Sequence, residues 1–91
     1  MSADLMRLLN SIGKSVFVEY YDIFSSSKLS TDEKIEKLPR EYSINGSRTR
    51  INCANRIFER GLEKDTLRIV IQARVDDHIK AKATYLLQNA K

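Results

Sequence analysis

Four polar side chains between residues 48 and 56 have the types and spacing needed to contact base edges. On a helix that turns by about 100° per residue, three of them share the side opposite the apolar side chains of the same segment, and the first, Arg48, flanks that side. The four residues are Arg48, Thr49, Asn52 and Arg56. Arginine can bond O6 and N7 of guanine, asparagine can bond N6 and N7 of adenine, and threonine can contact a base edge or a methyl group. This pattern predicts direct readout of duplex DNA.

Three further basic residues are expected to meet phosphate beside this face, namely Arg50, Arg60 and Lys64. Ser47 is the expected N-cap of the helix. The free amides of Arg48 and Thr49, together with the positive end of the helix dipole, would then favour a phosphate group.

Charge is unevenly distributed along the 91 residues. Residues 1–42 hold six basic and seven acidic side chains, whereas residues 43–91 hold ten basic and five acidic ones. The net charge of +4 therefore comes from the second half. It is compatible with a nucleic acid or an acidic protein as the partner.

Other kinds of chemistry find little support in the composition. Cys53 and His78 are the single cysteine and the single histidine, too few for a zinc site. Gly13, Gly46 and Gly61 are too far apart to form a phosphate-binding glycine loop. A chain this short also has little room for a cleft that excludes water. We therefore expect no metal, no cofactor and no enzymatic activity.

The basic face requires a helix over residues 48–60, and the sequence supports one. Its apolar residues recur every three or four positions, at Ile51, Ala54, Ile57, Phe58 and Leu62. Gly61 is the expected stop, and Asn45-Gly46 is expected to form a turn before the helix.

A shorter helix of about two turns is predicted to start at Thr31. Ser30 and Glu33 have the spacing of a capping box, in which each side chain bonds the backbone amide of the other residue. Pro39 disfavours helical geometry at the residue before it and so limits this helix to about two turns.

Three other helices complete the prediction. A long one over residues 5–24 follows an apolar stripe that crosses Gly13, with Ser2 as its expected N-cap. Others are expected over residues 64–73 and after Asp76 or Asp77. Residues 15–24 are also rich in β-branched and aromatic residues, and residues 66–75 alternate as a strand would, so a two-stranded sheet is the alternative.

The expected fold is therefore all-α, a single domain over residues 1–91 with about five helices. The capped helix, the connection and the basic helix at 30–61 resemble a helix-turn-helix unit, without resembling a particular family. This resemblance implies that the basic helix enters the major groove. The expected connection of residues 39–47 is longer than the three or four residues usual for that motif.

Sequence features also bear on location. One cysteine cannot form an internal disulfide, which fits a reducing compartment. No apolar run approaches the roughly 18–20 residues needed to cross a bilayer, and Arg7, Asn10 and Ser11 interrupt the first leucines. We expect a cytoplasmic protein without a membrane partner.

The functional prediction is a small DNA-binding protein, a homodimeric transcriptional regulator or accessory factor. Phe17, Val18 and Tyr21 lie partly off the main apolar stripe, which makes the first helix an expected dimer element. A central helix wrapped by its own chain is the other interpretation of this feature. The alternative function is a non-enzymatic adaptor or inhibitor, of phage or plasmid type, whose basic helix docks an acidic protein.

Overall fold

The computed structural model describes residues 3–89, which form seven helices and no strand. The helices are α1 (Ala3–Ile12), α2 (Lys14–Glu19), α3 (Tyr21–Ser25), α4 (Thr31–Lys37), α5 (Ile44–Glu59), α6 (Glu63–Gln72) and α7 (Asp77–Asn89). The predicted all-α class is confirmed. The alternative two-stranded sheet is wrong, because both of its segments are largely helical. The alternating pattern in the second segment misled because α6 buries Thr66, Leu67 and Val70, a helical spacing, whereas Ile69 and Ile71 are only half-buried.

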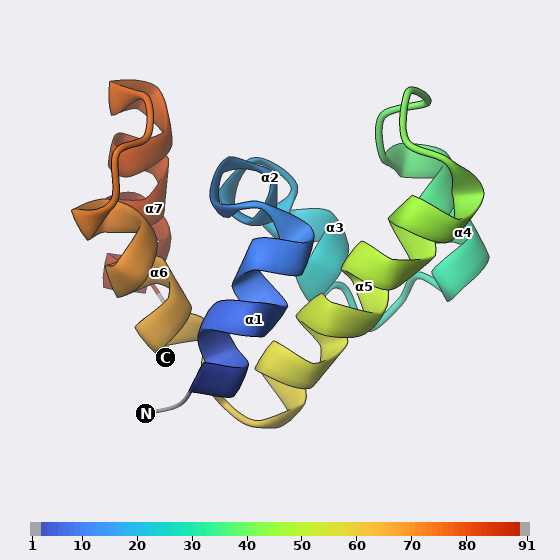
Figure 1. The fold of residues 1–91 in the computed structure, drawn as a ribbon, viewed down its shortest axis with the longest axis horizontal. Coiled ribbons are helices and arrows are strands. Elements are labelled where there is room, and N and C mark those ends of the chain that lie inside the picture. The colour runs from blue at the N-terminus through green and yellow to red at the C-terminus, as the bar shows by residue number, and fades with distance from the viewer. Residues whose placement is uncertain (1–2, 90–91) are drawn as a thin grey trace.

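The helices are arranged around α1, which lies in the middle of Figure 1 with α6 and α7 on one side and α5 and α4 on the other. The most extensive packing is between α1 and α5 and between α6 and α7. The colour gradient shows that α1 and α5 run in opposite directions (Figure 1). The amino-terminal half of α1 therefore lies beside the carboxyl-terminal half of α5.

The N-terminal segment is not one long helix, and the prediction of a continuous helix over residues 5–24 is wrong. Gly13 has a φ of 98°, which ends α1, and Tyr20 separates α2 from α3. These breaks change the direction of the chain, so that Phe17 and Val18 become fully buried instead of lying beside the stripe. The chain itself thus covers both residues, and they offer no surface to a second copy. Ser2, the predicted N-cap, lies outside the described residues.

Aromatic rings fill the centre of the fold. Phe17 stacks on Phe24 and on Phe58, with ring centroids 6.4 Å and 5.8 Å apart. Tyr21 meets Phe17 and Phe58 edge to face, at 5.5 Å and 5.4 Å. Since these rings come from α2, α3 and α5, the cluster fixes the two short helices against the long one.

The start of α4 confirms the predicted capping box. The Ser30 amide donates to Glu33 Oε1 at 2.9 Å, and the Glu33 amide donates to Ser30 Oγ at 3.2 Å. The helix ends at Lys37, and Leu38 is extended before Pro39, as predicted. Within α4, the buried Lys34 donates its Nζ to the Phe24 carbonyl at 3.1 Å and so ties α4 to α3. Burial lowers the pKa of Lys34.

The prediction for the start of α5 is wrong by four residues. Ser43, not Ser47, is the N-cap, and its Oγ accepts from the Gly46 amide at 2.9 Å. Gly46 therefore lies in the first helical turn, and Ser47 is only 2% exposed. Ser43 caps the helix because its side chain reaches the amide three residues later. The pair Asn45-Gly46 is typical of a turn, and this pattern led to the prediction of a later start.

The end of α5 agrees with the prediction. Gly61 has a φ of 69°. Its amide donates to the Phe58 carbonyl at 3.1 Å, and the Leu62 amide donates to the Ile57 carbonyl at 2.9 Å. This pair of bonds is the Schellman arrangement that satisfies the last carbonyls of a helix.

The connection between α4 and α5 now spans residues 38–43, six in all. It is shorter than the predicted connection but still longer than the turn of a usual helix-turn-helix unit. The likeness of α4 and α5 to that unit stays a prediction.

Substitution of Gly13 is expected to destabilise the fold, because φ 98° with ψ 130° lies outside the left-handed helical region that asparagine tolerates. Both Gly13→Ala and Gly13→Asn should lower the free energy of unfolding by about 1–3 kcal/mol. The matched control is Gly61→Asn, since Gly61 lies in the left-handed region and a Cβ there meets nothing within 4 Å. Urea unfolding of the three variants is the measurement. Equal losses at Gly13 and Gly61 on substitution by asparagine would contradict this explanation.

The capping box should make stability depend on pH through Glu33. The hydrogen bond from the Ser30 amide lowers the pKa of this carboxyl below its ordinary 4.5. Above pH 4.5 the carboxylate is ionised in both states and stabilises the fold in full. As the pH falls below 4.5 the unfolded chain binds the proton first, so this stabilisation declines until the folded carboxyl is protonated as well.

Urea unfolding across acidic pH should therefore show the stability difference between wild type and Glu33→Gln shrinking as the pH falls. Glu36→Gln, on the same helix, removes a carboxylate that makes no capping hydrogen bond and serves as the control. A difference for Glu33→Gln that does not change with pH would show that the carboxylate is not coupled to folding.

Candidate nucleic-acid interface

One side of α5 is anchored in the core and the opposite side faces solvent. The anchored residues are Ser47, Ile51, Ala54 and Ile57, and α5 packs against α1, α3 and α4. With this stripe inward, the opposite arc of the helix is exposed. Between residues 48 and 60 the exposed side chains are Arg48, Thr49, Asn52, Arg56, Glu59 and Arg60, which we call the α5 face.

The four predicted base-reading residues all belong to the α5 face. Arg48, Asn52 and Arg56 follow one another at intervals of four residues, about one helical turn. Thr49 lies beside them, and its Oγ1 donates to the Asn45 carbonyl at 2.9 Å. That bond uses the hydroxyl hydrogen and leaves the methyl group and an oxygen lone pair for a ligand.

Arg50 differs from the other arginines, because it is half-buried and already engaged. Its Nη1 donates to the Gly46 carbonyl at 3.1 Å, and its Cζ lies 3.9 Å from the centre of the Tyr42 ring. Within residues 3–89, its buried Nε has no hydrogen-bond partner. Arg50 therefore fastens the α4–α5 connection to α5 instead of standing free for phosphate, as the sequence had suggested.

The predicted anion site at the start of the basic helix is not formed as expected. Because α5 begins at Ile44, the amides of Arg48 and Thr49 lie within the helix, where carbonyls of the preceding turn accept from them. Lys64 belongs to the first turn of α6 and is half-buried. The turn at Gly61 and Leu62 separates it from the α5 face.

Arg7 is a basic residue near this face that the sequence reasoning missed. Asp4, Arg7 and Leu8 of α1 line a small cleft together with Arg56 and Arg60 of α5. Nothing in the spacing of residues 4–8 points to residues 56–60. Only the antiparallel packing of α1 on α5 brings these side chains together.

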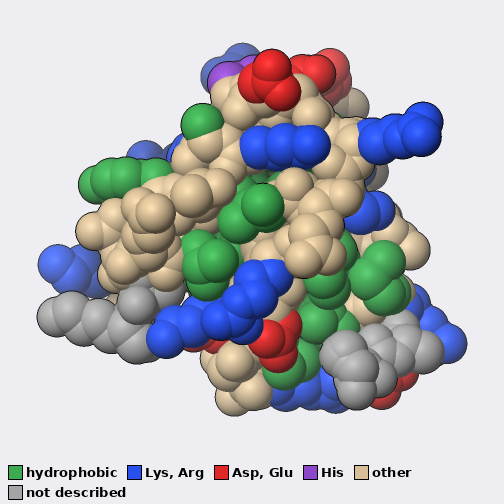
Figure 2. All heavy atoms as spheres, turned by 90° about the vertical axis from the view of Figure 1, so that its left-hand side faces the viewer, with side chains coloured by type: hydrophobic (Ala, Val, Ile, Leu, Met, Phe, Trp, Pro, Cys, Tyr) green, Lys and Arg blue, Asp and Glu red, His purple; other side chains and the backbone are tan. Residues whose placement is uncertain are grey.

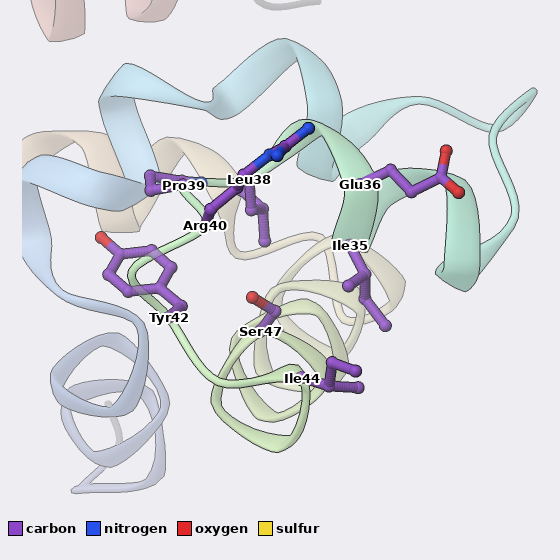
Figure 3. A pocket seen from close by; sticks show the side chains of 8 residues that line it. All are labelled: Ile35, Glu36, Leu38, Pro39, Arg40, Tyr42, Ile44 and Ser47. Carbon is purple, nitrogen blue, oxygen red and sulfur yellow. The ribbon is translucent and has the colours of Figure 1, made fainter.

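A larger hollow of about 480 Å³ lies where α4 meets the start of α5 (Figure 3). Its lining residues are Ile35, Glu36, Leu38, Pro39, Arg40, Tyr42, Ile44 and Ser47. The Ser47 hydroxyl points into it, whereas the Glu36 carboxylate points away (Figure 3). The hollow contains none of the predicted site residues.

Basic side chains elsewhere in the second half are dispersed. On the side formed by α6 and α7, apolar, acidic and other side chains separate the lysine and arginine side chains, drawn in blue, from one another (Figure 2). Two of them have partners: Arg68 pairs with Asp65 at 3.0 Å, and Lys82 Nζ donates to the Glu19 carbonyl at 2.9 Å. The positive charge is therefore more available on α5 than on this side.

Three observations concern other classes of site. Within residues 3–89, no three metal-ligating side chains converge on a point where an ion could bind. Cys53 is a free, half-buried thiol. None of the helices that the structure describes has the length and hydropathy needed to cross a membrane.

Comparison with known proteins adds no further information, since no protein-family model, curated protein or solved structure matches the chain.

The contact between Arg50 and Tyr42 can be measured by a double-mutant cycle. Arg50→Met and Tyr42→Leu should each lower the free energy of unfolding. Their coupling energy should be about 0.5–2 kcal/mol, because the stacked pair is half-buried. Urea unfolding of the two single variants and the double variant gives this value. Additive losses would mean that the stacking contributes nothing to stability.

Proposed function

We propose that the protein binds duplex DNA by placing the α5 face in the major groove. The observation that carries this proposal is the exposure of Arg48, Asn52 and Arg56 in one row, with Thr49 beside them, on a helix whose other side is fixed in the core. The major groove, about 12 Å wide, admits an α-helix. These four side chains supply the donors, acceptors and methyl group that distinguish base pairs.

The basic and polar residues of the α5 face have different proposed contacts, according to their position on the helix. Arg48, Thr49, Asn52 and Arg56 are assigned to base edges, and Arg60 at the end of the face is assigned to the phosphate backbone. Arg50 is left out because Tyr42 and the Gly46 carbonyl hold it. Lys64 keeps a phosphate role only if the DNA extends past the turn after α5.

The composition of the α5 face favours DNA over an acidic protein. The centre of a protein interface usually contains buried aromatic side chains together with arginine. The α5 face has three arginines, a glutamate, a threonine and an asparagine but no aromatic side chain, and the exposed apolar Ile44 lies one turn before Arg48. A polar, positively charged surface suits phosphates and base edges better.

A single copy makes few contacts, so affinity for random DNA should be modest, with a Kd of roughly 10⁻⁴–10⁻⁶ M. Pairing of two copies on adjacent half-sites is the usual route to tighter binding. We therefore retain a homodimeric regulator or accessory factor as part of the proposal. Its dimer contact would have to lie outside Phe17 and Val18, which are fully buried.

Fluorescence anisotropy with a random-sequence duplex at ~50 mM salt tests the proposal. Arg48→Ala/Arg56→Ala should weaken binding at least about tenfold, because it removes two contacts to the DNA. The matched control, Lys28→Ala/Arg74→Ala, removes the same charge from two exposed positions outside α5 and should change affinity little. Equal losses in the two double variants would show that net charge, not the α5 face, drives binding. No binding by the wild type would refute the proposal.

A further inference from the structure

We propose that the cleft between α1 and α5 binds a phosphate group of the DNA backbone, with Arg7 as a contact supplied by α1. This inference rests on the proposed function, because it adds a second helix to the same interface. It assigns Arg7 a role and places Arg56 at the junction of base and backbone contacts.

The cleft is built from two helices. α1 and α5 pack side by side in opposite directions (Figure 1). Arg7 of α1 therefore shares a small depression with Arg56 and Arg60 of α5. Leu8, which is 6% exposed, and Asp4 complete its lining. Both helices are anchored by buried side chains, so the backbones that carry the arginines are held in place.

The size of the cleft limits what can bind there. Its volume is about 140 Å³. Pockets for drug-sized ligands usually measure about 300–1,000 Å³, so a nucleoside would not be enclosed. A single phosphate group is small enough to enter and to meet more than one guanidinium.

Electrostatics favours an anion in the cleft. The cleft is lined by three arginines and one acidic residue, Asp4, so its lining side chains carry a net charge of +2. Within residues 3–89, none of these arginine side chains forms an ion pair or a hydrogen bond. Guanidinium stays protonated at any ordinary pH and offers paired donors that match phosphate oxygens. A phosphate would therefore relieve the repulsion among the arginines.

The position of the cleft favours a phosphate group of the DNA backbone over inorganic phosphate. Arg56 and Arg60 belong both to the cleft and to the α5 face. If that face lies in the major groove, the cleft at its edge meets one of the strands that border the groove. The amino-terminal half of α1 would then lie along the backbone beside the groove.

The salt dependence of DNA binding tests the assignment. Arg7→Gln should weaken duplex binding at ~50 mM salt by roughly three- to tenfold, and should reduce the slope of log affinity against log salt by about one. Arg74→Gln is the matched control, because Arg74 is exposed in the α6–α7 connection, on the other side of α1 from α5. Asp4→Asn should act in the opposite direction and raise affinity about two- to fivefold.

A second arm separates the two sources of phosphate. Inorganic phosphate is titrated into the wild type and into Arg7→Gln, and the arginine Nε–Hε signals are followed by NMR. Weak shifts that require Arg7, together with the loss of salt slope in DNA binding, support a backbone phosphate. Tight saturable binding of inorganic phosphate with unchanged DNA binding in Arg7→Gln would assign the cleft to a free anion and overturn the inference.

Failure of the inference is distinguishable from failure of the proposed function. If the wild type binds DNA and Arg7→Gln matches Arg74→Gln in affinity and slope, the α5 face stands and the cleft assignment is wrong. If the wild type binds no DNA, both are wrong as stated. Circular dichroism of each variant confirms that the helices are intact, so a loss of binding cannot be attributed to unfolding.

Discussion

The structure depends on the packing of α1 against α5. Leu5, Leu9 and Ile12 of α1 and Ile51, Ala54 and Ile57 of α5 are buried in one core, and α1 and α5 pack extensively against each other. Burial of a large aliphatic side chain contributes about 1.5–3 kcal/mol, so this seam outweighs any single polar contact in the chain. Because it fixes which side of α5 points inward, it also fixes which side carries the arginines to the surface.

The breaks at Gly13 and Tyr20 follow from the same need to cover α5. A straight helix over residues 5–24 could bury one stripe, and Phe17 and Val18 would remain outside it. By turning at Gly13, the chain brings Phe17 against Phe58 of α5 and Phe24 of α3. The backbone strain that any other residue would suffer at φ 98° is avoided by glycine. The apolar side chains of this segment that a single stripe could not bury are thus buried within the chain itself.

Basic side chains have different surroundings on α5 and on the side formed by α6 and α7. On the side of α6 and α7, basic groups alternate with other side chains, and two of them are bonded within the chain (Figure 2). On α5, Arg50 is stacked and bonded, yet Arg48, Arg56 and Arg60 remain exposed. Arg56 and Arg60 line a cleft with Arg7 where two helices meet, and a polyanionic ligand there would offset their positive charge. This contrast within one molecule adds to the exposed row of Arg48, Asn52 and Arg56 in support of DNA binding.

Local signals in the sequence determined the all-α class, the capping box of Ser30 and Glu33, the end of α4 before Pro39 and the glycine stop at Gly61. Each depends on neighbouring residues and on helical periodicity, which a sequence displays directly. The outward direction of Arg48, Asn52 and Arg56 was also readable, because the apolar stripe opposite them sets it. Tertiary structure alone decided the breaks at Gly13 and Tyr20, the earlier start of α5, the engagement of Arg50 and the meeting of Arg7 with Arg56. Those outcomes depend on which helices touch, and contacts between residues far apart in the chain leave no periodic trace in the sequence.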